Sequence, residues 1–171
     1  MLNVYEKIHK GQRAWIGRLL TALGTGEVAA LEEIGELVAH LRAHAQHEDT
    51  FIHPLIEEAA AAIAADLHAQ HELLDPVLLE LAGTARSGDV KGTYRSLALF
   101  AAQYFRHIDV EEHQAMPALN SAFDDAALRE RIFVPFGASR TLDDLVADLR
   151  LQLVALSPGE ARELLAGVVS G

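Results

Sequence analysis

The sequence predicts an all-α protein: an up-down-up-down four-helix bundle with additional C-terminal helices packed on it. Three observations support this fold class. Apolar residues recur every three or four positions in long segments, short glycine-containing breaks separate several of those segments, and one histidine and glutamate pattern occurs twice. With 171 residues, half of them apolar, the chain is expected to form one domain, with the bundle at residues 1–122 and a helical extension at residues 123–171.

The first two bundle helices are expected at residues 4–23 and 27–65. The first carries a helical stripe of apolar side chains that stops at the Gly24-Thr25-Gly26 break. The second has the same periodicity and contains Pro54, which should kink it because a proline inside a helix removes one backbone hydrogen bond.

The third and fourth bundle helices are expected at residues 66–86 and from Val90 to about Asn120. A turn at Ser87-Gly88-Asp89 separates them. Pro76 is a second expected kink, and the fourth helix contains Pro117.

The C-terminal third predicts a weaker helix at residues 125–133, a break at 135–137, a longer amphipathic helix at 141–156 and a last helix that begins at Ser157. There Ser157 can cap the helix and Glu160 completes a capping box. We interpret this part as a cover on the bundle or a dimer surface.

Each half of the bundle contains a histidine followed, 35 or 36 residues later, by His-x-x-x-Glu. On a helix, residues four apart lie on one face, so an imidazole and a carboxylate can reach the same or adjacent metal ions. Two such sets suit a pair of metal ions better than one. The residues are His9, His44 and Glu48 in the first half, and His71, His107 and Glu111 in the second, and each glutamate is followed six residues later by proline.

Helix geometry places the four histidines at comparable heights. At about 1.5 Å per residue, His9 lies roughly 20 Å before the first turn and His44 roughly 26 Å after it. His71 lies about 23 Å before the second turn and His107 about 27 Å after it. All four can therefore share one layer of the bundle.

Composition restricts the chemistry further. The chain has no cysteine, so a metal must be held by nitrogen and oxygen ligands, and imidazole with carboxylate favours Fe, Mn or Zn. A net charge of -11 argues against nucleic acid as a partner. No segment approaches the length of apolar residues that crosses a bilayer, and no signal peptide core is visible, so a cytoplasmic protein without a membrane partner is expected.

These motifs resemble the hemerythrin-like family, four-helix proteins also described as histidine-histidine-glutamate cation-binding domains, over about residues 1–120. The resemblance implies a non-haem di-iron centre with bridging carboxylates. By position, His9 and His44 would serve one iron, His71 and His107 the other, and two glutamates would bridge them. Zn or Mn are possible substitutes.

Two features depart from the oxygen-carrying members of that family. Those proteins have His-x-x-x-His on the third helix and an aspartate five residues after the last histidine, whereas here His68 lies three residues before His71, and Glu111 lies four residues after His107. His68 is included as a candidate ligand, and Asp75 is an alternative oxygen ligand. Fewer imidazoles make reversible oxygen carriage a less natural role.

The site looks more like those of bacterial members of the family, and this resemblance makes binding or sensing of O2, NO or peroxide the expected function. A di-iron peroxidase or oxidase, an iron-storage protein, and a bundle that holds zinc or no metal for structural or regulatory purposes are the alternatives. No catalytic residue is assigned, and an enzyme is not the leading expectation. The protein would be a monomer or homodimer, and a sensor would need a protein partner that the sequence does not identify.

Other polar residues near the repeat have two interpretations. Tyr5 and Tyr104 could each donate a hydrogen bond to a bound oxygen species, or could be core aromatics with a satisfied hydroxyl, which is favoured. The remaining histidines are not assigned as ligands: His40 and His47 are expected at the surface or beside the site, His53 in packing, and His113 in solvent.

Overall fold

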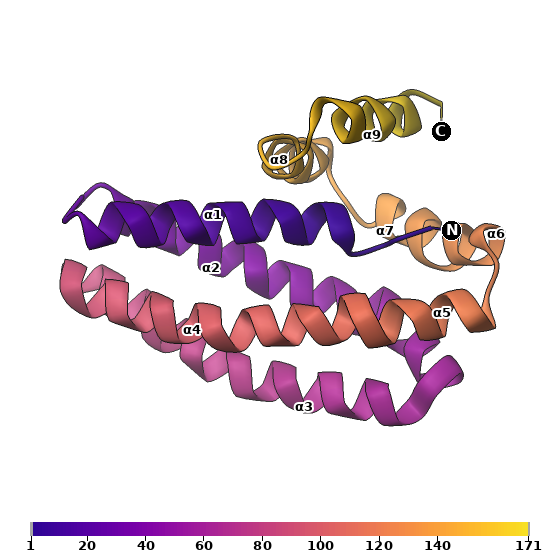
Figure 1. Cartoon of the computed structure of the whole chain (residues 1–171), viewed down its shortest axis with the longest axis horizontal. Coiled ribbons are helices and arrows are strands. Elements are labelled where there is room, and N and C mark those ends of the chain that lie inside the picture. Colours follow the sequence, from indigo (N-terminus) through magenta and orange to yellow (C-terminus); the bar gives the residue numbers. More distant parts are fainter. Residues whose placement is uncertain (1, 171) are drawn as a thin grey trace.

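A computed structural model describes residues 2–170, including the side chains of residues 2–166, and every regular element in that part of the chain is helical. Four long helical segments form an up-down-up-down bundle, and shorter helices follow at the C-terminal end (Figure 1). The helices are α1 (Glu6–Gly24), α2 (Ala30–His47), α3 (His53–Arg86), α4 (Val90–Val110), α5 (Met116–Ala122), α6 (Asp125–Leu128), α7 (Val134–Ala138), α8 (Leu142–Leu153) and α9 (Pro158–Ser170). None of the helices described is long and apolar enough to cross a bilayer.

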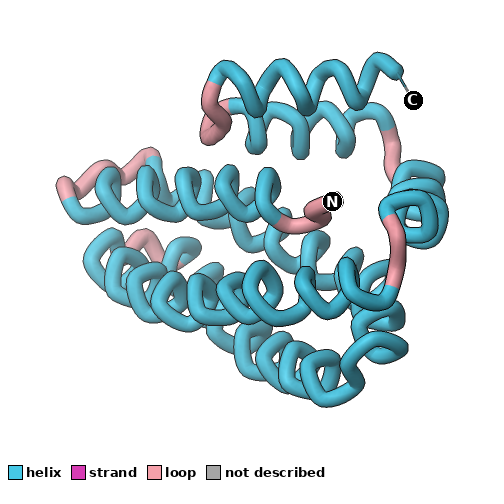
Figure 2. The backbone as a smooth tube through the Cα atoms, turned by 45° about the vertical axis from the view of Figure 1, so that its right-hand side comes forward, coloured by secondary structure: helices cyan, strands magenta, loops and turns pink. Residues whose placement is uncertain are grey.

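The four bundle helices surround one core. Helix α3 packs against α2 and α4, and α1 packs against the same two helices from the other side. The connections at the α1/α2 and α3/α4 ends are short (Figure 2), and each contains a glycine with positive φ, Gly26 at 85° and Gly88 at 78°. Both turns fall where the sequence predicts them, because glycine adopts this conformation without a steric penalty.

The turn between the second and third bundle helices differs from the prediction. The chain was expected to pass from one helix to the next at residues 65 and 66, but the backbone leaves helical geometry at Ala60, with φ -160° and ψ 75°. The reversal lies within an alanine-rich stretch that has no glycine or proline. The helix that follows continues through Pro76 to Arg86.

Three π-helical turns occur in the described chain, and each precedes a proline. They are η1 (Glu48–Ile52), η2 (Glu111–Ala115) and η3 (Arg129–Phe133), and the prolines are Pro54, Pro117 and Pro135. Proline has no N–H and its ring crowds the preceding turn, which favours a local widening of the helix. The expected break at residues 135–137 is therefore wrong, because the chain stays helical to Ala138.

Two clusters of buried apolar side chains lie along the bundle. One contains Ile16, Leu41 and Phe100, and the other contains Ile52, Leu67 and Leu119. In every bundle helix the residues of the predicted metal layer fall between members of the two clusters. The polar layer is thus enclosed by apolar side chains on both sides along the bundle axis.

The C-terminal extension packs against α1 through α8, which crosses it, and α9 lies beyond α8 (Figure 1). Lys10 on α1 forms an ion pair with Glu160 on α9. Arg140 contacts His47 on α2 and donates a hydrogen bond to Asp148 on α8 at 2.8 Å. The predicted capping box is formed, since the Ser157 N–H donates to Glu160 Oε2 at 2.9 Å and Ser157 Oγ accepts from the Glu160 N–H at 3.4 Å. The extension therefore covers one side of the bundle.

Candidate metal centre

The structure brings six of the seven predicted ligands to one level of the bundle. They come from different elements: His9 from α1, His44 from α2, Glu48 from η1, His71 from α3, His107 from α4 and Glu111 from η2. The residues of the two halves of the sequence repeat face each other across the core.

The first histidine pair joins α1 and α2. Nε2 of His9 and Nε2 of His44 are 3.4 Å apart. Oε1 of Glu48 lies 3.0 Å from Nε2 of His44, and Oε2 of Glu111 lies 3.4 Å from Nε2 of His9. His9, His44 and Glu48 therefore form one group whose ligand atoms all lie within 4.8 Å of one another, and Glu111 approaches this group through His9.

The second histidine pair joins α3 and α4 in the same manner. Nε2 of His71 and Nε2 of His107 are 3.1 Å apart. Oε2 of Glu48 lies 3.6 Å from Nε2 of His71, and Oε1 of Glu111 lies 3.4 Å from Nε2 of His107. Each glutamate thus presents one oxygen to each histidine pair, which is the arrangement a carboxylate needs to bridge two cations.

Both glutamates begin a π-helical turn. The carbonyl of Glu48 accepts from the His53 N–H, and the carbonyl of Glu111 accepts from the Met116 N–H, each five residues further on. Single π turns are frequent at functional sites because they change which side chains face inward. The proline six residues after each glutamate is the sequence signal for this local geometry.

The buried polar atoms fit a pair of cations. Glu48 is 1% exposed and Glu111 is 0% exposed, and within the described part of the chain Oε1 of Glu48 and both oxygens of Glu111 accept no well-formed hydrogen bond. Burying carboxylates without partners is costly unless a cation compensates. The histidine nitrogens around them are the second ligand type that such cations take.

Without a cation, Glu111 holds a proton more tightly than Glu48 does. Burial and the charge of Glu48 raise the pKa of Glu111 well above its usual range. Burial also acts to raise the pKa of Glu48, but His44, His71 and His9 outweigh it and bring that pKa well below its usual range. Like charges so close cannot both ionise easily, so binding of cations would displace the proton from Glu111.

Three of the four histidines are oriented through their other ring nitrogen. Nδ1 of His9 lies 3.0 Å from Glu112 Oε1, and this carboxylate also accepts two bonds from Arg13, at 2.7 and 2.9 Å. Nδ1 of His71 lies 3.1 Å from Asp49 Oδ1.

The third of these contacts joins Nδ1 of His107 to Gln70 Oε1 at 3.0 Å. An Nδ1–H that donates to oxygen leaves the Nε2 lone pair directed at the centre, which is the tautomer that a metal requires. Burial and the neighbouring His71 contribute to lowering the pKa of His107 to about 3, so this imidazole is neutral at pH 7. Sequence reasoning did not assign the orienting residues Asp49, Gln70 and Glu112, since nothing in their spacing distinguishes them from surface polar residues.

His68 is the one predicted ligand that the structure does not bring into the cluster. Its side chain is 68% exposed and its Nε2 lies 3.6 Å from Glu72 Oε1. A side chain three positions before His71 on a helix is rotated by about 60° around the helix axis from the His71 side chain. Here that rotation points the His68 imidazole to solvent. Asp75 is also outside, paired with Arg42 Nε at 3.0 Å.

The unassigned histidines lie close to their expected places. His113 is exposed beside Asp109, and half-buried His47 contacts Arg140. His53 is buried and stacks on His71 with ring centroids 5.0 Å apart. Nδ1 of His53 lies 2.9 Å from Asp49 Oδ1, the same oxygen that His71 contacts. The three side chains are close enough to hold a cation. Hydrogen bonds from the two histidines to Asp49 account for the arrangement without one.

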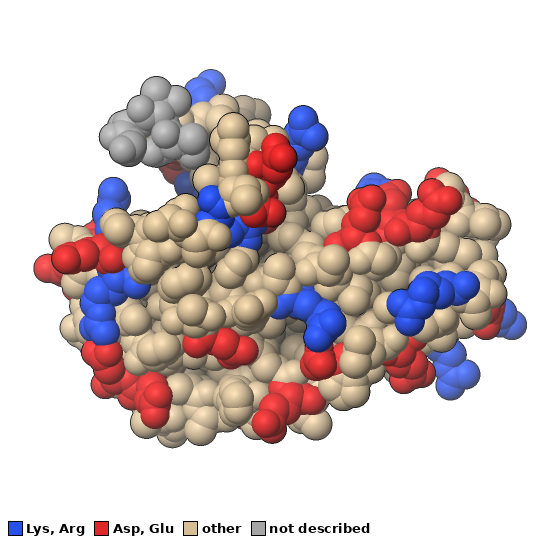
Figure 3. All heavy atoms as spheres, turned by 180° about the vertical axis from the view of Figure 1, so that it is seen from behind, with Lys and Arg blue, Asp and Glu red and all other residues tan. Residues whose placement is uncertain are grey.

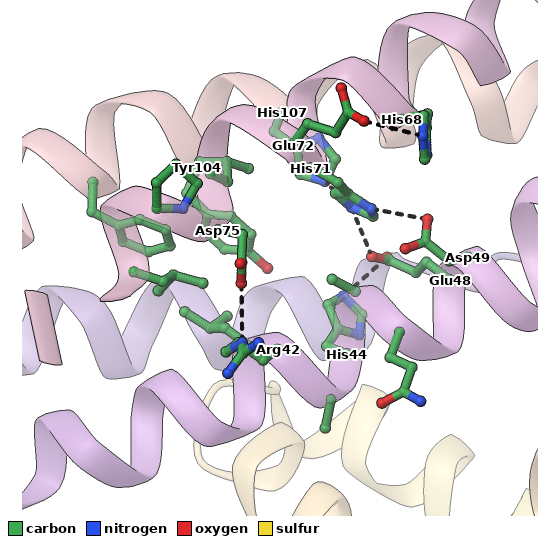
Figure 4. Close-up of a pocket in the computed structure, with 18 of the residues that line it drawn as sticks. Arg42, His44, Glu48, Asp49, His68, His71, Glu72, Asp75, Tyr104 and His107 are labelled. Atoms are coloured by element: carbon green, nitrogen blue, oxygen red, sulfur yellow. Dashed lines mark hydrogen bonds and ion pairs between the residues drawn. The ribbon is translucent and has the colours of Figure 1, made fainter. Parts of the chain in front are cut away.

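A cleft of about 910 Å³ between α2 and α3 leads from solvent to the centre (Figure 4). His44, Glu48, His71 and His107 line its inner end, while the Arg42–Asp75 pair lies across it. On this face of the molecule, turned away in Figure 1, charged side chains of both signs are spread among uncharged ones (Figure 3). The centre is thus reached through the α2/α3 side rather than from the side covered by the C-terminal helices.

A buried His/Glu cation site within a four-helix bundle defines a class of metal-binding helical proteins. Comparison with known families matches residues 1–119 to the hemerythrin HHE cation-binding domain, and the chain belongs to that family. Its fold is therefore a hemerythrin-like bundle with additional C-terminal helices. No curated protein and no solved structure matches the chain.

Proposed function

We propose that this protein holds two iron ions and binds or senses O2, NO or peroxide with them. The observation that carries the proposal is that both glutamates lie between the two histidine pairs: one oxygen of Glu48 and one of Glu111 lie within 3.6 Å of a nitrogen in each pair. A single cation would leave one histidine pair unused. Iron so held would supply redox chemistry and open positions for a small oxygen or nitrogen ligand.

The surrounding residues favour such a role. His44 and His71 are the more accessible member of each pair, with side chains 14% and 10% exposed, and both face the α2/α3 cleft. Their partners His9 and His107 are 0% and 3% exposed. A small ligand can therefore approach from one side, while the apolar clusters keep solvent from the rest of the layer.

The first experiment is to measure metal content per chain in protein purified without added metal, together with its visible absorption under air and under argon. About two irons per chain and bands that change with oxygen are the expected result. Zinc, one metal or none, persisting after anaerobic reconstitution with iron, would contradict the di-iron proposal and favour the structural or regulatory alternative.

A peroxidase is the second candidate, because the cleft is far larger than a diatomic ligand requires. A volume of about 910 Å³ is in the range of sites for organic molecules. Apolar side chains such as Leu74, Leu78 and Phe100 line part of it. Sustained consumption of peroxide with a phenolic reductant by the iron-loaded protein would favour this candidate, and a single turnover would argue against it.

A further inference from the structure

Tyr5 packs directly on the candidate metal centre. It lies immediately before α1, is 0% exposed, and its ring stacks on that of His9 with centroids 5.3 Å apart and an interplanar angle of 21°. It does not line the α2/α3 cleft, so it approaches the centre from another direction.

The hydroxyl of Tyr5 has no hydrogen-bond partner within the described part of the chain. Tyr104 provides a comparison in the same layer, because its buried hydroxyl donates to Gln12 Oε1 at 2.7 Å. Buried hydroxyls usually find a partner, since an unmade hydrogen bond is expensive. Tyr104 is therefore a core aromatic with a hydrogen-bonded hydroxyl, as expected from the sequence, whereas the hydroxyl of Tyr5 differs from that expectation.

The groups around Tyr5 point to the kind of partner it lacks. It belongs to an apolar cluster with side chains such as Ile52, Ile56 and Leu119, which offer no acceptor. A tyrosine hydroxyl is a hydrogen-bond donor, and here it belongs to a ring that stacks on one of the candidate metal ligands. The partner it lacks is therefore an acceptor that the described side chains do not provide.

We propose that Tyr5 is the hydrogen-bond donor for an anionic or oxygen-containing ligand bound at the metal pair. This inference rests on the proposed function, because its acceptor is a ligand of the loaded centre. Tyr5 holds such a ligand from the α1 side, while the ligand enters through the cleft on the α2/α3 side.

The first test uses metal-free protein and thermal unfolding. Tyr5→Phe removes a hydroxyl that has no partner, so its midpoint should equal or exceed that of the wild type. Tyr104→Phe leaves Gln12 Oε1 buried without its donor and should lower the midpoint by about 3 °C. Tyr94→Phe, at an exposed position, is the control. A fall for Tyr5→Phe as large as that for Tyr104→Phe would mean that the hydroxyl already has a partner, which overturns the proposal.

The second test measures azide affinity of the ferric protein from its charge-transfer absorption, with azide as an acceptor-only anion. Wild type and Tyr5→Phe should both load two irons, and the variant should bind azide about tenfold or more weakly, with Tyr94→Phe unchanged. Equal affinity with full iron loading would overturn the role of Tyr5 alone. A wild type that does not load two irons would overturn the proposed function and, with it, this inference.

Discussion

Glu48 and Glu111 occupy equivalent places on opposite sides of the bundle core. Each begins a π-helical turn, each lies four residues after a histidine, and each presents its two oxygens to different histidine pairs. The duplicated sequence pattern is thus also a duplicated local structure. Because the two carboxylates are shared, loss of either should affect both metal positions.

Replacement of Glu111 with glutamine tests this sharing. Glu111→Gln keeps the size of the side chain but removes the charge, so iron loading should fall from about two per chain to one or fewer. Metal analysis after reconstitution measures the ratio, and Glu36→Gln, at an exposed position on α2, is the control. Two irons bound with unchanged affinity would contradict the bridging assignment.

His68 and His71 should behave differently although they are three residues apart. The His68→Ala variant loses a solvent-exposed side chain and should load metal as the wild type does. The His71→Ala variant loses one nitrogen of the second pair and should hold fewer than two irons. Metal analysis of both proteins checks this, and a loss of metal in His68→Ala would support its prediction as a ligand.

Glu112 should control affinity without being a ligand. It accepts from His9 Nδ1 and from Arg13, and these two groups, against the opposing effect of burial, lower its pKa to about 2. Glu112→Gln weakens the orientation of His9, and we expect metal affinity to fall about 10- to 100-fold with the fold retained. Competition with a chromophoric chelator measures the change, and Glu57→Gln, at an exposed position, serves as the comparison. Unchanged affinity would exclude an orienting role.

Gly11 should be required for the docking of α8. A Cβ at this position would lie 2.7 Å from Leu151 O and 2.9 Å from Leu151 Cγ, so Gly11→Ala should displace α8 and destabilise the protein by about 1–3 kcal/mol. Gly17 is in the same helix with open space around it, and Gly17→Ala should be stabilising by about 0.5–1 kcal/mol. Thermal unfolding and hydrogen exchange in α8 distinguish the two, and equal effects would argue against the close crossing.

Acid should destabilise the metal-free protein partly through His40. Burial and the nearby charges of His44 and Arg140 lower the pKa of His40 to about 3, against about 6.5 in an unfolded chain. Between these values the unfolded state binds more protons, so the free energy of unfolding falls as pH falls, by up to about 1.4 kcal/mol per pH unit for one group.

The test compares thermal midpoints from about pH 6.5 to about pH 4. His40→Gln should flatten the pH dependence, whereas His113→Gln, at an exposed position, should leave it unchanged. The same slope in His40→Gln as in the wild type would mean that His40 titrates normally in the folded protein.

The local periodicity of the sequence was enough to predict the bundle and that six of the candidate ligands lie at one level of it. Residues four apart share a helix face, and equal distances from the turns bring His9, His44, His71 and His107 to one level, so these positions follow from helix geometry alone. Glycine marked two of the three reversals within the bundle because Gly26 and Gly88 need positive φ.

Contacts between helices decided the orientation of His68, the reversal at Ala60 and the hydrogen-bond partners around the centre. The rotation of α3 turns His68 to solvent and His71 inward, and the chain reverses at Ala60 without a glycine or proline to mark it. The partners of Asp49, Gln70 and Glu112 come from other helices or from the following turn. Whether the hydroxyl of a tyrosine is satisfied likewise depends on neighbours distant in sequence, such as Gln12 for Tyr104, and a sequence pattern records only spacing along the chain.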